Sequence, residues 1–224
     1  ALSGVTTVAS GGARTCVVDG SGTRCFRYDR LSLSMLSIGG MEDVVAVSVG
    51  QQHVCGLTAH GKVLCWGENA SGQIGDGTQL HRAIPVQIGD TFRAVQISCG
   101  HAHTCAAGQN GRAYCWGSNA AGQVGSSGGG SLSQPQAVRG LQGVQEVVAG
   151  DVFSCARLRD GSVTCWGATK RGHFVDGGIK GNRQILLLKG GKCLRTRRVN
   201  TFSEKPRLDD GVDFDARIFE QLRQ

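Results

Sequence analysis

Paired cysteines recur through this chain at a fixed distance. Three pairs lie 50 residues apart, and within each pair the two cysteines are ten positions apart: Cys55 and Cys65, Cys105 and Cys115, Cys155 and Cys165. The second cysteine of each pair begins a Cys-Trp-Gly tripeptide, and these tripeptides contain all three tryptophans of the chain. A fixed period of roughly 20 to 50 residues is typical of stacked or circular repeat proteins. We therefore expect one small structural unit to be repeated.

Each unit divides into four short extended segments. In the unit that begins near residue 41 they cover 44–49, 53–58, 62–66 and 83–88. Turns rich in glycine separate segments that are rich in β-branched residues, which is the pattern of short strands. Four strands in each 50-residue unit predict an all-β protein built from propeller blades.

The hairpin turn of each unit sets its two cysteines opposite each other. Each three-residue loop ends in a glycine, at Gly61, Gly111 and Gly161. A glycine there suits a left-handed last loop residue. If Thr58 and Lys62 close the loop as a hydrogen-bonded pair, Cys55 and Cys65 become a directly opposed, non-hydrogen-bonded pair with Cα atoms about 4.5 Å apart. That distance permits a disulfide.

We therefore predict four disulfides, and disulfides are typical of an oxidising compartment. The predicted disulfide cysteines are Cys16, Cys25, Cys55, Cys65, Cys105, Cys115, Cys155 and Cys165. Two alternatives remain open. The cysteines are free, buried packing thiols, or they bind zinc together with His53 and His103, which precede Cys55 and Cys105 by two residues. Against zinc, Arg14 and Phe153 replace the histidine in the outer units while the cysteines remain.

The ends of the chain depart from the repeat. We divide the chain into a divergent N-terminal blade at 1–40, propeller repeats at 41–178 and a basic tail of unassigned fold at 179–224. Residues 180–224 carry eleven Lys or Arg against six Asp or Glu, and 214–223 have the pattern of a short amphipathic helix. One hypothesis for the tail is a truncated or frame-shifted gene. The start at Ala1, with no signal-peptide pattern, is interpreted as that of a mature or trimmed product.

Beyond this periodicity, the segment VAVSVGQQHVCGLTAHGKVLCWGENASGQIGDG resembles the repeat of the regulator of chromosome condensation family. The resemblance covers roughly 41–178 and is weaker over 1–40. The residues at the repeat's structural positions are Gly50, His53, Trp66, Gly67, Gln73, Gly100, His103, Trp116, Gly117, Gln123, Gly150, Trp166 and Gly167. Asn69 and Asn119 fall on the family pattern as well.

The resemblance implies a seven-bladed β-propeller, of which this chain supplies an incomplete arc of about four blades of four antiparallel strands. An open arc exposes blade edges, so self-association is the expected physical risk. The cysteine pairs depart from the nuclear members. They resemble those of exported bacterial proteins and of some plant receptor ectodomains with this repeat.

No catalytic, metal or cofactor site is expected from the motifs. The nucleophile elbow, the phosphate loop and the zinc-protease motif are all missing from the sequence. Asp76 and Asp176 are interpreted as loop residues, with a calcium loop as the alternative. Cys99 occupies a buried strand position and is expected to pack as a small apolar residue. Cys193 lies in the unassigned tail.

The expected function is that of a non-enzymatic protein-interaction scaffold located outside the cell, in the periplasm or at the cell surface. The loops at 68–79 and 118–132, or the rim near the hairpins, are expected to contact a protein partner. We expect no small-molecule substrate, cofactor, nucleic acid or membrane span. One alternative is a nuclear or cytoplasmic guanine-nucleotide exchange factor for a small GTPase that also binds chromatin. A second alternative is an exported enzyme inhibitor.

Overall fold

A computed structural model of the chain shows strands as its regular structure. It describes residues 3–28, 33–41, 43–169, 172–174, 185–188 and 192–195. Within these residues the strands form four sheets of four antiparallel strands each and one two-stranded hairpin. The prediction of an all-β fold is confirmed.

We number the four sheets as blades 1 to 4 in chain order, and each is a simple meander. Blade 1 contains β1 (Thr7–Gly11), β2 (Arg14–Asp19), β3 (Gly22–Tyr28) and β4 (Leu33–Ser37). Blade 2 contains β5 (Val44–Val49), β6 (His53–Thr58), β7 (Val63–Gly67) and β8 (Arg82–Ile88). Blade 3 contains β9 (Ala94–Cys99), β10 (His103–Gly108), β11 (Ala113–Gly117) and β12 (Leu132–Ala137). Blade 4 contains β13 (Val144–Ala149), β14 (Phe153–Leu158), β15 (Val163–Thr169) and β16 (Gly172–Phe174).

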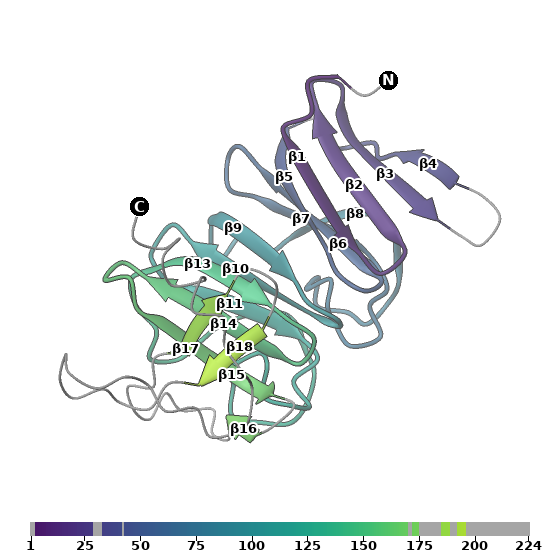
Figure 1. Cartoon of the computed structure of the whole chain (residues 1–224). Coiled ribbons are helices and arrows are strands. Elements are labelled where there is room, and N and C mark those ends of the chain that lie inside the picture. Colours follow the sequence, from purple (N-terminus) through teal and green to yellow (C-terminus); the bar gives the residue numbers. More distant parts are fainter. Residues whose placement is uncertain are drawn as a thin grey trace, which may run out of the picture.

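The blades follow one another in an arc, from blade 1 to blade 4 (Figure 1). The first strand of each blade contacts the first strand of the next, so β1, β5, β9 and β13 form the inner side of the arc. The fourth strand of each blade is an edge of its sheet. We call the face of a blade that looks towards the preceding blade its upstream face, and the opposite face its downstream face.

The hairpin between the second and third strands has the predicted geometry. The Thr58 amide donates to the Lys62 carbonyl at 2.9 Å, and Gly61 has a φ of 76°. A left-handed φ of this kind is free of strain only for glycine. The register then sets Cys55 directly opposite Cys65.

Each blade carries one disulfide across this hairpin. The bonds join Cys16 to Cys25, Cys55 to Cys65, Cys105 to Cys115 and Cys155 to Cys165. Their Cα atoms lie 4.0 to 4.1 Å apart, somewhat closer than the 4.5 Å expected from ideal strand pairing.

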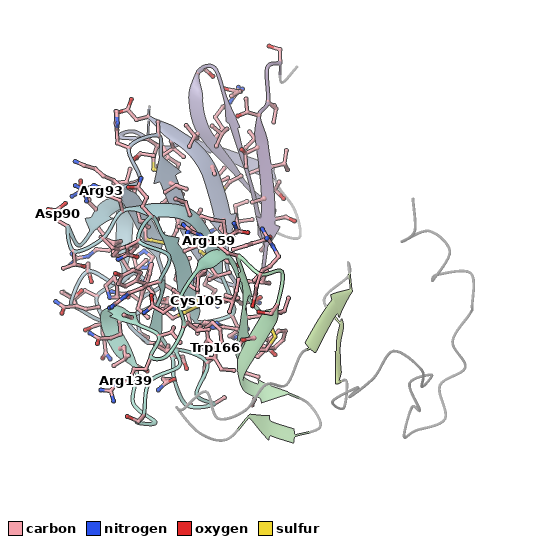
Figure 2. All side chains as sticks on the ribbon, turned by 90° about the vertical axis from the view of Figure 1, so that its left-hand side faces the viewer. Asp90, Arg93, Cys105, Arg139, Arg159 and Trp166 are labelled. Carbon is pink, nitrogen blue, oxygen red and sulfur yellow. A yellow bond between two sulfur atoms is a disulfide. The ribbon has the colours of Figure 1, made fainter. Side chains whose placement is uncertain are left out.

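The hydrophobic core lies between the blades. One cluster joins the Cys55–Cys65 disulfide of blade 2 to Trp116 of blade 3, and the next joins Cys105–Cys115 to Trp166 of blade 4. Figure 2 shows Cys105 and Trp166 inside the body of the molecule. Each of these disulfides therefore lies on a downstream face, where the tryptophan of the following blade covers it.

Beyond blade 4 the structure describes the hairpin of β17 (Ile185–Leu188) and β18 (Lys192–Arg195), with β17 in contact with β15. The predicted helix at 214–223 and the loop residue Asp176 lie outside the described residues. No helix long and apolar enough to cross a bilayer occurs in the described part of the chain.

Candidate functional site: the joints between blades and the exposed rim

In blades 2 and 3 the loop after Trp-Gly is held closed by a buried asparagine. In blade 2 the Asn69 amide nitrogen donates to the carbonyls of Thr78 and Leu80, while its oxygen accepts from the Ile74 amide at 2.9 Å. Asn119 accepts in the same way from the Val124 amide at 3.0 Å. The loop conformation is therefore fixed by its own hydrogen bonds.

These loops were predicted to contact a partner, and the structure restricts that prediction to their outer halves. In the first loop Asn69, Gln73 and Ile74 are buried, and Ile74 packs with Trp116 of the next blade. Ala70 is exposed, and the other exposed residues of this loop lie at Gly77 and beyond. The inner half of each loop is a packing element between blades.

A single backbone carbonyl organises each of the two later joints between blades. The Gln73 carbonyl of blade 2 accepts from the Trp116 indole nitrogen and from the Thr104 hydroxyl, both at 2.9 Å. The joint between blades 3 and 4 repeats this arrangement. There the Gln123 carbonyl accepts from Trp166 and Ser154, both at 2.8 Å. The hydroxyl and indole are thus a matched pair of donors for the preceding blade's loop.

The buried histidine of each middle blade extends this network. His53 Nε2 lies 2.8 Å from Thr104 Oγ1, and His103 Nε2 lies 3.0 Å from Ser154 Oγ. Burial, and next the positive charge that His103 carries when protonated, lowers the pKa of His53 to about 3, and burial lowers the pKa of His103 to about 4. Both rings are therefore neutral at physiological pH, as packed hydrogen-bonding groups are.

Two glycine positions allow the backbones to meet at these joints. A Cβ on Gly100 would stand 2.3 Å from the Gly150 carbonyl oxygen of the next blade, and one on Gly50 would stand 2.5 Å from that of Gly100. Contacts this short do not occur for real Cβ atoms. The glycines at 50-residue spacing therefore set how closely neighbouring blades approach.

The joint between blades 1 and 2 is built differently. Blade 1 lacks the long loop, so it offers no carbonyl to Trp66, whose indole nitrogen has no hydrogen-bond partner among the described residues. The hydroxyl position is Val54 and the histidine position is Arg14, which donates instead to the Gln52 carbonyl at 3.0 Å. The loss of the loop and the loss of the hydroxyl thus occur together.

The zinc alternative does not fit the donor atoms. A possible ligand group does exist, because His53, Cys55 and Cys99 bring their ligand atoms within 4.8 Å of one another. Cys55 is in a disulfide and offers no thiolate. Burial raises the pKa of the free Cys99 thiol to about 12, which opposes the thiolate that zinc requires. Sequence reasoning missed Cys99 here because it comes from the next blade.

The calcium alternative at Asp76 is also not supported by the geometry. Its carboxylate accepts from the Thr78 amide and hydroxyl and forms an ion pair with Arg82. The Arg82 guanidinium already neutralises this carboxylate, and its other contacts lie within the loop. Asp76 therefore stabilises the closed loop. The corresponding Asp176 lies outside the described residues.

Two features of the surface remain after the joints are accounted for. Leu80 and Ile84, on the outer rim of blade 2, are 65% and 73% exposed. At one end of the inner strands, the turns of all four blades surround an open hollow of about 490 Å³ whose walls include Gly12, Gly50 and Gly100. Its walls include five glycines, together with Gln51, His101 and Asp151.

Sequence models of the regulator of chromosome condensation (RCC1) repeat match this chain. One matches residues 60–107 and 110–157, and a second matches 44–73, 94–123 and 144–172. Together they span 44–172, which is more than half of the chain. The chain belongs to the regulator of chromosome condensation repeat family. The comparison with curated proteins finds no match.

Several solved structures share the fold. Human WBSCR16 is 22% identical with a TM-score of 0.66, and the match covers 76% of this chain and 51% of that one. Prp20p from Saccharomyces cerevisiae is 18% identical with a TM-score of 0.64, covering 73% and 45%. Yeast RCC1 (Prp20) bound to Kap60 is 19% identical with a TM-score of 0.63, and the match covers 73% of this chain and 43% of that one. The chain thus spans about half the length of these proteins, and the predicted arc of four propeller blades is confirmed.

Proposed function

We propose that this chain is a non-enzymatic protein-interaction scaffold of an exported or cell-surface protein. The observation that carries the proposed location is the presence of one disulfide in every blade. Structural disulfides persist in oxidising compartments and are rare in the reducing cytosol. The scaffold role is supported by membership of a propeller family, in which fixed strands carry variable loops.

The rim of blade 2 is the proposed contact surface. Leu80 and Ile84 are exposed aliphatic side chains on the segment that follows the closed loop. The neighbouring Asp76–Arg82 ion pair holds the backbone of this segment in place. A rigid surface that combines apolar side chains with charged ones suits a protein partner better than a small ligand.

A thiol count on the full chain, purified from its natural host, tests the location. We expect eight of the ten cysteines to resist alkylation in denaturant without reductant, and all ten to react after reduction. A folded protein whose cysteines nearly all react without reductant would remove the argument for export.

Exchange of guanine nucleotide is the second candidate, because the chain shares its fold with Prp20p, whose structure was described together with its binding to Gsp1p and histones. The test is release of labelled nucleotide from a small GTPase in the presence of the chain. Release above the intrinsic rate would favour this candidate and a nuclear or cytoplasmic location. Unchanged release, together with eight blocked cysteines, would favour the scaffold.

A further inference from the structure

A free thiol lies beside a disulfide at the joint between blades 2 and 3. Cys99 is free and buried, and it belongs to the hydrophobic cluster that contains both cysteines of the Cys55–Cys65 disulfide. The Cys99 sulfur, the Cys55 sulfur and a ring nitrogen of His53 all lie within 4.8 Å of one another. The thiol and the disulfide bond thus share one buried space.

Strand pairing and a hydrogen bond hold the thiol in this place. Cys99 lies directly opposite Thr104 at the end of β9, so both side chains lie on the upstream face of blade 3. The Cys99 amide donates to Ser48 Oγ of blade 2 at 2.9 Å, and the Thr104 hydroxyl donates to the Gln73 carbonyl at 2.9 Å. Both residues of the pair are therefore tied to blade 2, and the thiol is kept beside the disulfide.

The next joint has the same construction without the thiol. Ala149 lies opposite Ser154, and its amide donates to Ser98 Oγ at 2.9 Å. At this joint Cys105 Sγ lies 3.4 Å from Ser154 Oγ. The Cys105–Cys115 disulfide therefore occupies an equivalent place, with a methyl group where the other joint has a thiol.

We propose that the Cys99 thiol exchanges with the Cys55–Cys65 disulfide to give a disulfide between blades. The thiol loses its proton, and the Cys99 sulfur attacks Cys55 Sγ. A bond forms between Cys99 and Cys55 while the Cys55–Cys65 bond breaks. The Cys65 sulfur leaves as a thiolate and takes up a proton. One disulfide and one thiol are present before and after, so the step requires no oxidant or reductant.

The exchange changes what the disulfide connects. Cys55–Cys65 joins neighbouring strands of one blade, whereas Cys55–Cys99 joins β6 of blade 2 to β9 of blade 3. The product therefore holds the two blades together covalently, and the original bond leaves their contact to packing and hydrogen bonds. This inference requires the disulfide, but it does not depend on the scaffold role.

The supply of thiolate sets the rate of the exchange. Burial raises the pKa of Cys99 to about 12. Because the thiolate is the attacking species and its amount rises tenfold for each pH unit below the pKa, exchange should be about a hundredfold faster at pH 9 than at pH 7. His53 faces Cys99 from β6 and has a pKa of about 3, so its charge does not change in this range. Ser48 of β5 and Thr104 of β10 do not ionise there.

Disulfide mapping of the folded full chain tests the proposal. The chain carries Cys193→Ser, so that Cys99 is the one cysteine outside the four disulfides. It is incubated at pH 9 without reductant, and free thiols are then trapped with N-ethylmaleimide in urea at pH 6. We expect the label to move from Cys99 to Cys65 as a linked Cys55–Cys99 peptide appears in equal amount. The number of labelled thiols should stay at one per chain, and the rate should not depend on protein concentration.

Two variants test whether Cys99 is the attacking group. Cys99→Val gives blade 3 the residue that blade 2 has at this position, Val49, and no label should then reach Cys65. Adding Ala149→Cys to that variant places a thiol at the next joint. The label should now move to Cys115 instead.

Three outcomes would overturn the proposal. A label that stays on Cys99 after incubation of the folded chain at pH 9 would show that the two groups do not react. A label on Cys55 would show that the other sulfur is attacked. Equal labelling of Cys25, Cys65 and Cys115 would show that the disulfides rearrange through the unfolded chain.

Discussion

A hydrogen-bonded series runs from His53 of blade 2 through Thr104 of blade 3 to the Gln73 carbonyl. It predicts that substitutions of His53 and Thr104 have coupled effects on the free energy of unfolding. Replacing Thr104 by valine retains the shape of the side chain and removes its hydroxyl. The Gln73 carbonyl keeps its bond from Trp116, while the buried His53 Nε2 loses its partner. An unsatisfied buried polar group costs roughly 1 to 3 kcal/mol, so we expect a loss of about 2 kcal/mol in the free energy of unfolding.

Replacing His53 by phenylalanine as well removes the unsatisfied nitrogen. Blade 4 shows that a phenylalanine ring fits this position, because the Phe153 ring approaches Gly150 to within 2.4 Å of a built Cβ, as the His53 ring approaches Gly50. His53→Phe alone is expected to cost about 1 kcal/mol, the net value of one hydrogen bond. The double variant should then be no less stable than Thr104→Val alone. Independent effects would add to a larger loss, so the two side chains have a coupling energy of at least about 1 kcal/mol.

The assay is urea unfolding of the four proteins of this cycle without reductant, followed by tryptophan fluorescence and checked by calorimetry. The matched control is Val54→Thr, which places a hydroxyl at the corresponding position of blade 2. Blade 1 has no loop carbonyl to accept from it, so this variant should not gain comparable unfolding free energy. If Thr104→Val has the same effect with and without His53→Phe, the two side chains act independently. The proposed network would then be wrong.

Three further predictions concern buried side chains. Because His53 and His103 have folded pKa values of about 3 and 4, below their ordinary value, their neutral form stabilises the fold above about pH 6.5. Stability should fall by about 1.4 kcal/mol per histidine for each pH unit below that, and replacing both by phenylalanine should flatten a profile of melting temperature against pH. Replacing Cys105 and Cys115 together by alanine should cost about 3 kcal/mol of unfolding free energy in calorimetry, from a closed loop of about ten residues. The Cys99 thiol should resist iodoacetamide at pH 8 in the folded protein and react in urea, and equal rates would contradict its burial.

The repeat period and the hairpin turns were sufficient to predict the blades. A three-residue loop ending in Gly61 fixes the register, and alternation along two strands then sets Cys55 opposite Cys65. These are local relations, so a single sequence contains them. The count of blades followed because each unit carries its own turn and its own cysteine pair.

The joints were not predicted, because they depend on backbone atoms and on residues about 50 positions apart. The Gln73 side chain marked a family position, yet its carbonyl makes the contact with the next blade. The proximity of Cys99 to His53 likewise arises only when blade 3 packs on blade 2. One signal was present in the sequence: Thr104 and Ser154 follow blades with the loop, and Val54 follows the blade without it.

The position of the disulfides connects the chemistry of the chain to its assembly. Cys55 and Cys65 are fully buried because blade 3 covers the downstream face of blade 2. A reductant can therefore reach this bond only after the joint opens, and the same barrier hinders oxidation of the two thiols once the blades have docked. Formation of each disulfide should then precede docking of the next blade. Reduction under native conditions should occur no faster than opening of the joint, and Thr104→Val, which weakens that joint, should accelerate reduction of Cys55–Cys65 but leave reduction of Cys155–Cys165 unchanged.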